Sequence, residues 1–257
     1  MFFKLFKKQP KKDYEYLTNE LEKEKQKLIS DLEKNGIRFL INKMSCDEDY
    51  SELLTERRKI EMSFGSEDCI SHYAYKQSDK LSSPADKQEL LELLSDPEYT
   101  GLEKYIYCCL SSLCSNTNDA ALFNFLIEKI QKEDDESTIV SVLSRLRDVK
   151  KDSNHNIEPI KKIIAQGSYN ESKAAIMALS FTTDPEVEDI LLYEFKIADK
   201  HMQGMICGPL STVGTLKSIP VLKEVYKKTR DSFLRPSIEN AIDAIEKRGD
   251  KINLLSS

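Results

Sequence analysis

The sequence predicts an all-α protein, and three observations carry this prediction. Charged residues make up 32% of the 257 residues and hydrophobic residues 40%, enough for solvated surfaces around a real core. Glycine and proline occur only eight times each, which favours helices over a turn-rich β sandwich. From about Asp96 onward, apolar helical segments recur in pairs separated by short polar turns, as is typical of stacked helical hairpins.

The second helix of each predicted pair carries a large apolar residue at a nearly constant interval. These register positions are 33, 33, 31 and 35 residues apart, at Leu113, Leu146, Leu179, Leu210 and Ile245. Neighbouring apolar residues three or four positions away extend each one into a stripe on one helix face. A single hairpin cannot bury its stripe, whereas stacked hairpins cover one another. We therefore expect an α-solenoid of four to five helical hairpins.

Local signals predict where the helices begin and end. Asp96-Pro97-Glu98 and Asp184-Pro185-Glu186 each offer an N-cap oxygen, a proline for the first helical position and an acid for the first turn. We expect a helix to begin at each of them. Polar or glycine-containing segments predict further breaks, at residues 115–119, 151–156, 166–168, 213–215 and 228–231.

Three stretches of this region resemble a known repeat family. Residues 173–179 (KAAIMAL), 184–187 (DPEV) and 218–222 (SIPVL) resemble the short HEAT-like repeats that also occur in phycobilin lyases. The resemblance covers about residues 96–248 and implies an α-solenoid. It implies little about function, because such repeats serve as scaffolds, inhibitors and occasionally enzymes. The basic residue that these repeats often carry early in the second helix is kept only at Lys173.

The N-terminal third shows no matching register. We expect a charged helix over residues 14–34, an apolar patch at 37–41, a second helix near 50–62, and an irregular connection or degenerate hairpin over 63–83. The ends of a solenoid need a polar covering. The chain is accordingly divided into a basic tip (1–12), a helical cap (13–83) and a HEAT-like repeat domain (84–257).

Charge is unevenly distributed along the chain. The formal net charge is −6, but residues 1–12 carry five lysines and no acid, which leaves −11 on the remainder. An acidic body repels nucleic-acid phosphates and attracts a basic protein by long-range steering. We therefore expect another protein as the partner, basic in character, and no nucleic acid.

The residues that could carry chemistry form no recognised catalytic or metal-binding pattern. None of His72, His155 and His201 has a second histidine or cysteine at the spacing that zinc requires, and the six cysteines form no CxxC motif. No phosphate-binding glycine loop or nucleophile elbow is present. The sequence thus predicts no enzymatic activity, no cofactor, no metal and reduced cysteines.

The sequence also predicts a cytoplasmic location. No apolar run reaches the roughly 18–20 residues that span a bilayer, and the basic tip lacks the apolar core of a secretion signal. Aromatic residues and lysines alternate in the first eight residues (MFFKLFKK), so membrane contact through residues 1–12 is an alternative to a frayed or packed terminus.

Two features are candidates for partner contact. The acids of residues 133–136 and of 184–189 are either solvated helix caps or a negative field for a basic partner. Gly204 and Gly208 each cost a helix about 1 kcal/mol relative to alanine, which either close packing or a notch on the binding face would offset. The residues expected to contact the partner are Glu133, Asp134, Asp135, Glu136, Lys173, His201, Met202, Gln203 and Met205.

Together these expectations favour a non-catalytic protein-binding scaffold, specifically a bacterial immunity or inhibitor protein that neutralises a basic toxin. One alternative is an enzyme of the HEAT-like lyase or DNA-glycosylase kind, which would need an aromatic-lined pocket with a convergent polar group. The absence of tryptophan and the acidic body count against a glycosylase. A membrane-proximal structural adaptor is the third alternative.

Overall fold

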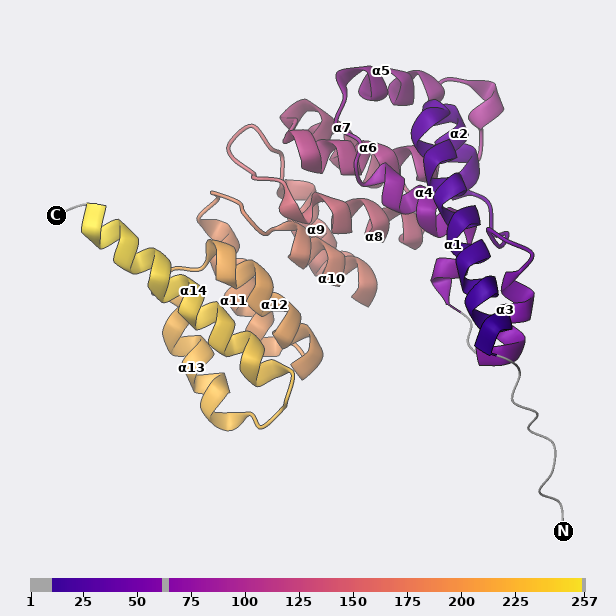
Figure 1. Cartoon of the computed structure of the whole chain (residues 1–257). Coiled ribbons are helices and arrows are strands. Elements are labelled where there is room, and N and C mark those ends of the chain that lie inside the picture. The colour runs from indigo at the N-terminus through magenta and orange to yellow at the C-terminus, as the bar shows by residue number, and fades with distance from the viewer. Residues whose placement is uncertain (1–10, 62–64, 256–257) are drawn as a thin grey trace, which may run out of the picture. The chain divides into compact units, whose positions relative to one another are not determined.

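The computed structural model describes residues 11–61 and 65–255, and every regular element in them is a helix (Figure 1). The predicted all-α fold is confirmed. Most of the basic tip, and with it the predicted membrane contact, lies outside the described residues. The chain forms two compact units that divide after Cys109, whereas the predicted boundary at residue 84 coincides with the start of a helix.

The described elements of the N-terminal unit are short apart from the first helix. In chain order they are α1 (Lys11–Lys34), α2 (Gly36–Met44), α3 (Leu54–Glu61), the 3₁₀ turn η1 (Ser66–Asp68), α4 (Ile70–Ser78), α5 (Pro84–Leu93), η2 (Pro97–Tyr99) and the beginning of α6 (Glu103–Thr117). Helix α2 is central, because it contacts α1, α4 and α5. Its apolar face is buried at Ile37, Leu40, Ile41 and Met44, as the predicted apolar patch requires.

One predicted helix start in this unit opens only a short 3₁₀ turn. The side chain of Asp96 does accept a hydrogen bond from the Glu98 backbone N–H, at 3.1 Å. The proline that follows opens only the 3₁₀ turn η2, and α6 begins later, at Glu103. Gly101 separates the two elements with a φ of 86°, a left-handed conformation that ends helical hydrogen bonding and that glycine adopts without steric cost.

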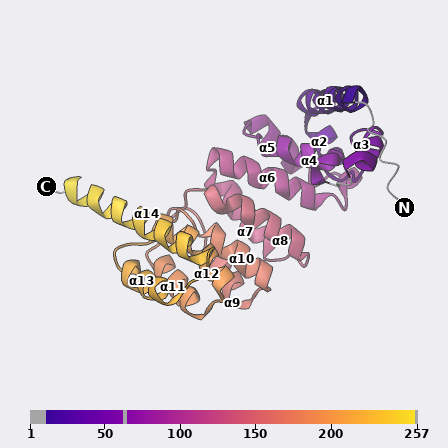
Figure 2. The same cartoon turned by 60° about the horizontal axis from the view of Figure 1, so that its bottom comes forward.

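The C-terminal unit continues from α6 as a series of helix pairs (Figures 1 and 2). The pairs are α7 (Ala120–Ile130) with α8 (Glu136–Arg145), α9 (Glu158–Gln166) with α10 (Tyr169–Ala178), α11 (Glu186–Ile197) with α12 (Lys200–Val213), and α13 (Ser218–Lys228) with α14 (Leu234–Leu255). The 3₁₀ turn η3 (Leu146–Asp148) extends α8. Second helices also contact one another in order, α8 with α10, α10 with α12 and α12 with α14, while α7 contacts α9 and α11 contacts α13.

The register residues occupy the interior, as predicted. Each is at most 1% exposed: Leu113, Leu146, Leu179, Leu210 and Ile245. Residues on the same helix faces, such as Val142 and Ala175, are buried with them. Since burying a large aliphatic side chain stabilises a fold by about 1.5–3 kcal/mol, this shared interior is the main source of cohesion between pairs.

Acidic and hydroxyl side chains start most helices of this unit. Asp119, Asp135, Ser168 and Asp199 each accept a hydrogen bond from a backbone N–H in the first turn of α7, α8, α10 and α12, respectively. The helix start predicted at Asp184-Pro185-Glu186 is confirmed, since α11 begins at Glu186, although Pro185 and not Asp184 is its N-cap residue. The Asp184 carboxylate accepts the Glu186 N–H at 2.9 Å. Each such cap contributes about 1 kcal/mol to helix stability.

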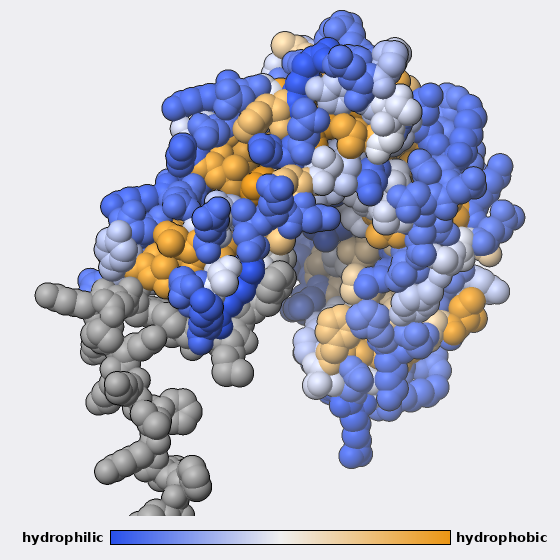
Figure 3. All heavy atoms as spheres, turned by 90° about the vertical axis from the view of Figure 1, so that its right-hand side faces the viewer, coloured by the Kyte–Doolittle hydropathy of each residue, from blue (hydrophilic) through white to orange (hydrophobic). Residues whose placement is uncertain are grey.

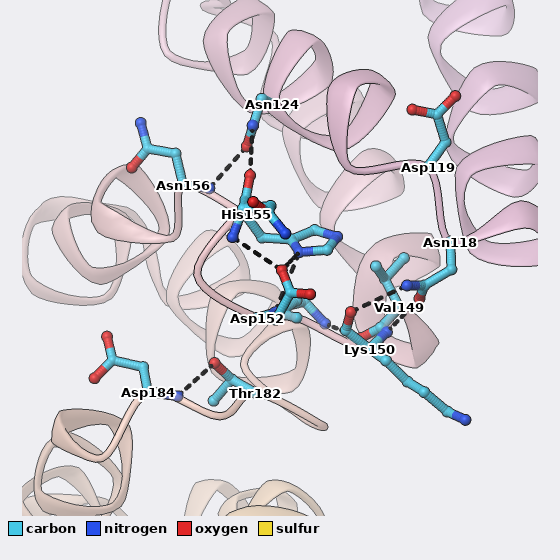
Figure 4. Close-up of polar contacts among 12 residues, drawn as sticks. Asn118, Asp119, Asn124, Val149, Lys150, Asp152, His155, Asn156, Thr182 and Asp184 are labelled. Atoms are coloured by element: carbon cyan, nitrogen blue, oxygen red, sulfur yellow. Dashed lines mark hydrogen bonds and ion pairs between the residues drawn. The ribbon is translucent and has the colours of Figure 1, made fainter.

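Asparagine side chains tie the loops of successive pairs together (Figure 4). Asn118, in a left-handed conformation with φ 56°, accepts the backbone N–H of Lys150 at 2.7 Å and donates to its carbonyl at 3.2 Å. Asn124, six residues further on, accepts from the Asn156 N–H and donates to the carbonyl of Asn154. The loop between η3 and α9 is thereby fixed against the preceding helix pair.

Lys151 is the one lysine among the fully buried side chains of the described residues, with 1% exposure. Its Nζ donates to the carbonyl oxygens of Val149 at 2.6 Å and Ser180 at 3.0 Å, and so joins the end of η3 to the end of α10. The backbone of Lys151 pairs with the same segment, since its N–H donates to Phe181 and its carbonyl accepts from Thr183. Burial lowers the pKa of Lys151 from 10.5 to about 7.

This depressed pKa predicts a specific pH dependence of stability. Between pH 7 and about 10 the unfolded chain holds a proton on Lys151 that the folded chain has released, so the free energy of unfolding rises with pH in this window. Replacing Lys151 with methionine removes that contribution. The free energy of unfolding is measured by urea denaturation at pH 7 and at pH 9. Its increase between the two pH values is expected to be about 2 kcal/mol smaller in Lys151→Met than in the wild type.

The matched control for this measurement is Lys150→Met, because Lys150 is the adjacent lysine and its side chain is exposed. Its pH dependence is expected to equal that of the wild type. A Lys151→Met variant with the full wild-type gain between pH 7 and pH 9 would contradict the assignment.

Candidate functional site

Second helices form a groove across α8, α10 and α12, with a volume of about 520 Å³. Helix α8 and its extension supply Glu136, Ser137, Val140, Ser144 and Arg147; α10 supplies Asn170, Lys173, Ala174 and Met177; α12 supplies Met205. The spacing places each contribution on one face of its helix. We refer to this feature as the α8–α10–α12 groove.

The charges in the groove are two cations and one acid. The Glu136 carboxylate accepts hydrogen bonds from Ser168 Oγ and Asn170 Nδ2, both at 2.9 Å, so its acceptor capacity is partly used. Lys173 is half-buried and forms no ion pair with any described residue. Arg147 pairs with the adjacent Asp148 at 3.2 Å, and both side chains are about half exposed. The two cations are therefore free, or nearly free, to meet an anion.

Methionines form the apolar part of the groove. Met177 and Met205 are half-buried and contribute flexible thioether side chains, which adapt to differently shaped surfaces. Gly208 lies beside Met177, because a Cβ on Gly208 would be 3.6 Å from Met177 Cε. The interior of α12 also contains Pro209, which cannot donate a helical hydrogen bond.

Three of the residues predicted to contact a partner lie together in this groove: Glu136, Lys173 and Met205. The other lining residues were missed. A signal for them was present, since Glu136, Val140, Ser144 and Arg147 follow one another at intervals of four, four and three residues, the spacing of a single helix face.

The remaining acids of the first predicted cluster lie outside the groove. Asp135 caps α8 and also accepts hydrogen bonds from the hydroxyls of Ser137 and Thr138, which lowers its pKa to about 2. Glu133 accepts the backbone N–H groups of Asp134 and Asp135. These contacts support the helix-cap interpretation of residues 133–135.

The predicted notch around Gly204 is filled. A Cβ on Gly204 would lie 2.3 Å from Cε1 of Phe233, whose ring stacks on His201 with the centroids 5.7 Å apart. Met202 is only 6% exposed and belongs to the core, and Gln203 donates its amide to the Phe195 carbonyl at 2.9 Å. Gly204 therefore serves close packing, whereas the exposed Gly208 borders the groove.

The second predicted acidic cluster is largely neutralised by local contacts. Lys161 Nζ lies 2.8 Å from Glu158, 2.9 Å from Asp184 and 3.1 Å from Glu186. The three carboxylates come within 4.8 Å of one another, as metal ligands would, but the lysine ammonium already joins them. Glu188 and Asp189 have partners too: Glu188 is buried and accepts from the Thr215 N–H and from Ser218 Oγ, and Asp189 pairs with Lys217.

The acidic surplus is concentrated in residues 13–109. Residues 13–109 contain 22 acidic and 13 basic residues, whereas residues 110–257 contain 22 acidic and 20 basic ones. Residues 110–257, which form the groove, are thus nearly neutral, and a negative field would arise mainly from residues 13–109.

The surface displays hydrophilic side chains around several separate hydrophobic areas on the face shown in Figure 3. Large apolar side chains with at least 43% exposure include Tyr169, Phe181, Tyr193, Ile197 and Phe233. Over the described residues, no helix has both the length and the apolar character that crossing a bilayer would demand.

No protein-family model, curated protein or solved structure matches this chain.

The two glycines of α12 give a paired prediction about stability. Gly208→Ala is expected to stabilise the protein by up to about 1 kcal/mol, since alanine favours the helix and the new methyl group meets Met177 at ordinary contact distance. Gly204→Ala must displace the Phe233 ring, which costs about 1–3 kcal/mol. In urea denaturation, the free energy of unfolding of Gly204→Ala is expected to be at least about 1 kcal/mol lower than that of Gly208→Ala.

Removing the ring provides the control. In a Phe233→Ala background, Gly204→Ala is expected to gain stability as Gly208→Ala does, because the clash is gone. Equal effects of the two glycine substitutions in the wild-type background would show that Phe233 does not constrain Gly204.

Proposed function

We propose that the C-terminal unit is a short α-solenoid of HEAT-like hairpins and that it binds a segment of another protein in the α8–α10–α12 groove. The ordered contacts from α8 to α10, α12 and α14 support the solenoid, because in such an array each hairpin packs on its neighbours. Helices α7, α9, α11 and α13 form the other layer in this proposal.

One observation supports the binding role. Two basic side chains with few acidic partners lie beside methionines in a groove built on well-packed helices. Lys173, Arg147, Met177 and Met205 supply these groups. Arginine and methionine are enriched in protein interfaces, where an adaptable apolar contact is combined with a directed polar one. The backbone beneath is fixed by buried register residues such as Leu179 and Leu210, so binding requires little ordering of the site.

The groove offers less to an enzyme of the lyase or glycosylase kind. Among the described residues that line it, none is aromatic, and a pocket for a flat ligand normally uses aromatic walls. A non-catalytic role is therefore the proposal that its chemistry favours.

A toxin-neutralising inhibitor with a basic partner is the more specific form of this proposal. It is supported by the excess of acidic over basic residues in residues 13–109, which would accelerate association with a cationic protein. In this form of the proposal, the acidic side chains of residues 13–109 attract the partner and the groove contacts it.

Site-specific photo-crosslinking in cells of the source organism tests the binding role. A photoreactive amino acid replaces Ser144, an exposed groove residue, or Lys196, an exposed residue of α11 outside the groove. The Ser144 position is expected to yield a discrete crosslinked protein, identified by mass spectrometry, that the Lys196 position does not yield. Crosslinks that form equally at both positions, or at neither, would count against the groove as a binding site.

A further inference from the structure

We infer that the segment bound in the α8–α10–α12 groove is an acidic peptide in which carboxylate side chains are interspersed with apolar ones. The inference rests on the proposed binding function and specifies its partner. It assigns to the groove a ligand of charge opposite to the basic partner that the net charge of the whole chain suggests.

The first argument is the charge that the groove leaves unsatisfied. Glu136 accepts hydrogen bonds from Ser168 and Asn170 on one of its two oxygens, and its single negative charge faces the two positive charges of Lys173 and Arg147. Lys173 is half-buried without an ion pair among the described residues, and a partly desolvated ammonium gains from an incoming carboxylate. The net charge of the residues that line the groove is therefore positive.

The second argument concerns Arg147, which stands at the far end of the α8 face from Glu136. Its partner Asp148 is the next residue in the chain, and the two side chains are 49% and 59% exposed. Exposed ion pairs of this kind contribute about 0–1 kcal/mol, so the guanidinium can exchange Asp148 for a better placed carboxylate at little cost. A guanidinium can bind that carboxylate with two parallel hydrogen bonds.

The third argument is the apolar surface between the charged positions. Val140, Met177 and Met205 line the groove together with Lys173 and Arg147, so an occupant must offer apolar side chains as well as carboxylates. From Glu136 to Arg147 the α8 face rises about 16 Å, the length of about five residues of extended chain. The groove thus fits a short linear segment better than a single ion.

Selection from a phage-displayed library of random twelve-residue peptides on the full-length protein tests the inference. Enriched peptides are synthesised, and their dissociation constants are measured by fluorescence anisotropy. We expect enrichment of Asp and Glu among apolar residues. We also expect affinity to fall at least about tenfold with Lys173→Glu combined with Arg147→Glu, and less than about twofold with the matched pair Lys162→Glu and Lys196→Glu, which lie outside the groove.

A third variant separates the inference from the function on which it rests. Ser144→Trp places a bulky side chain in the groove without changing its charge. Two outcomes would overturn the acidic ligand while supporting groove binding. In the first, the enriched peptides are basic and lose affinity for Ser144→Trp. In the second, the enriched peptides lose affinity for Ser144→Trp but bind the charge-reversed double variant as tightly as the wild type. Peptides indifferent to Ser144→Trp, or a failure to enrich any peptide, would overturn both.

Discussion

The C-terminal unit depends on one constraint, which is that each second helix has an apolar face that only its neighbours can cover. Leu146, Leu179 and Leu210 are completely buried. A single helix pair cannot bury such a face by itself. The contacts from α8 through α10 and α12 to α14 meet this requirement pair by pair. Because that layer is held by its buried side, the opposite sides of α8, α10 and α12 are left to line the groove.

The apolar periodicity predicted the interior well. The register residues, the apolar patch of α2 and most helix boundaries could be predicted because each depends on residues close together in sequence. At Asp96 the structure has a short 3₁₀ turn where an α-helix was predicted. A capping signal of three residues does not reveal that Gly101 will adopt a left-handed conformation. The solenoid and the binding role remain proposals.

Features that depend on distant residues could not be predicted locally. Gly204 is closely packed because Phe233, 29 residues later, lies across it, and the local sequence around Gly204 contains no sign of that ring. Lys150 and Lys151 are adjacent in a polar segment, yet one is exposed and the other is buried. The distribution of charge is a separate case, since the acidic surplus lies mainly in residues 13–109 and the net charge of the whole chain does not show this.

The polar ties of the C-terminal unit share a property that bears on how the chain folds. Asn118 with Lys150, Glu136 with Ser168, and Glu188 with Ser218 are 32, 32 and 30 residues apart. Loops of nearly equal length carry nearly equal closure entropies, so no tie imposes a much larger ordering penalty than the others. Assembly can therefore nucleate at any two adjacent hairpins and spread in both directions, without waiting for the chain ends to meet.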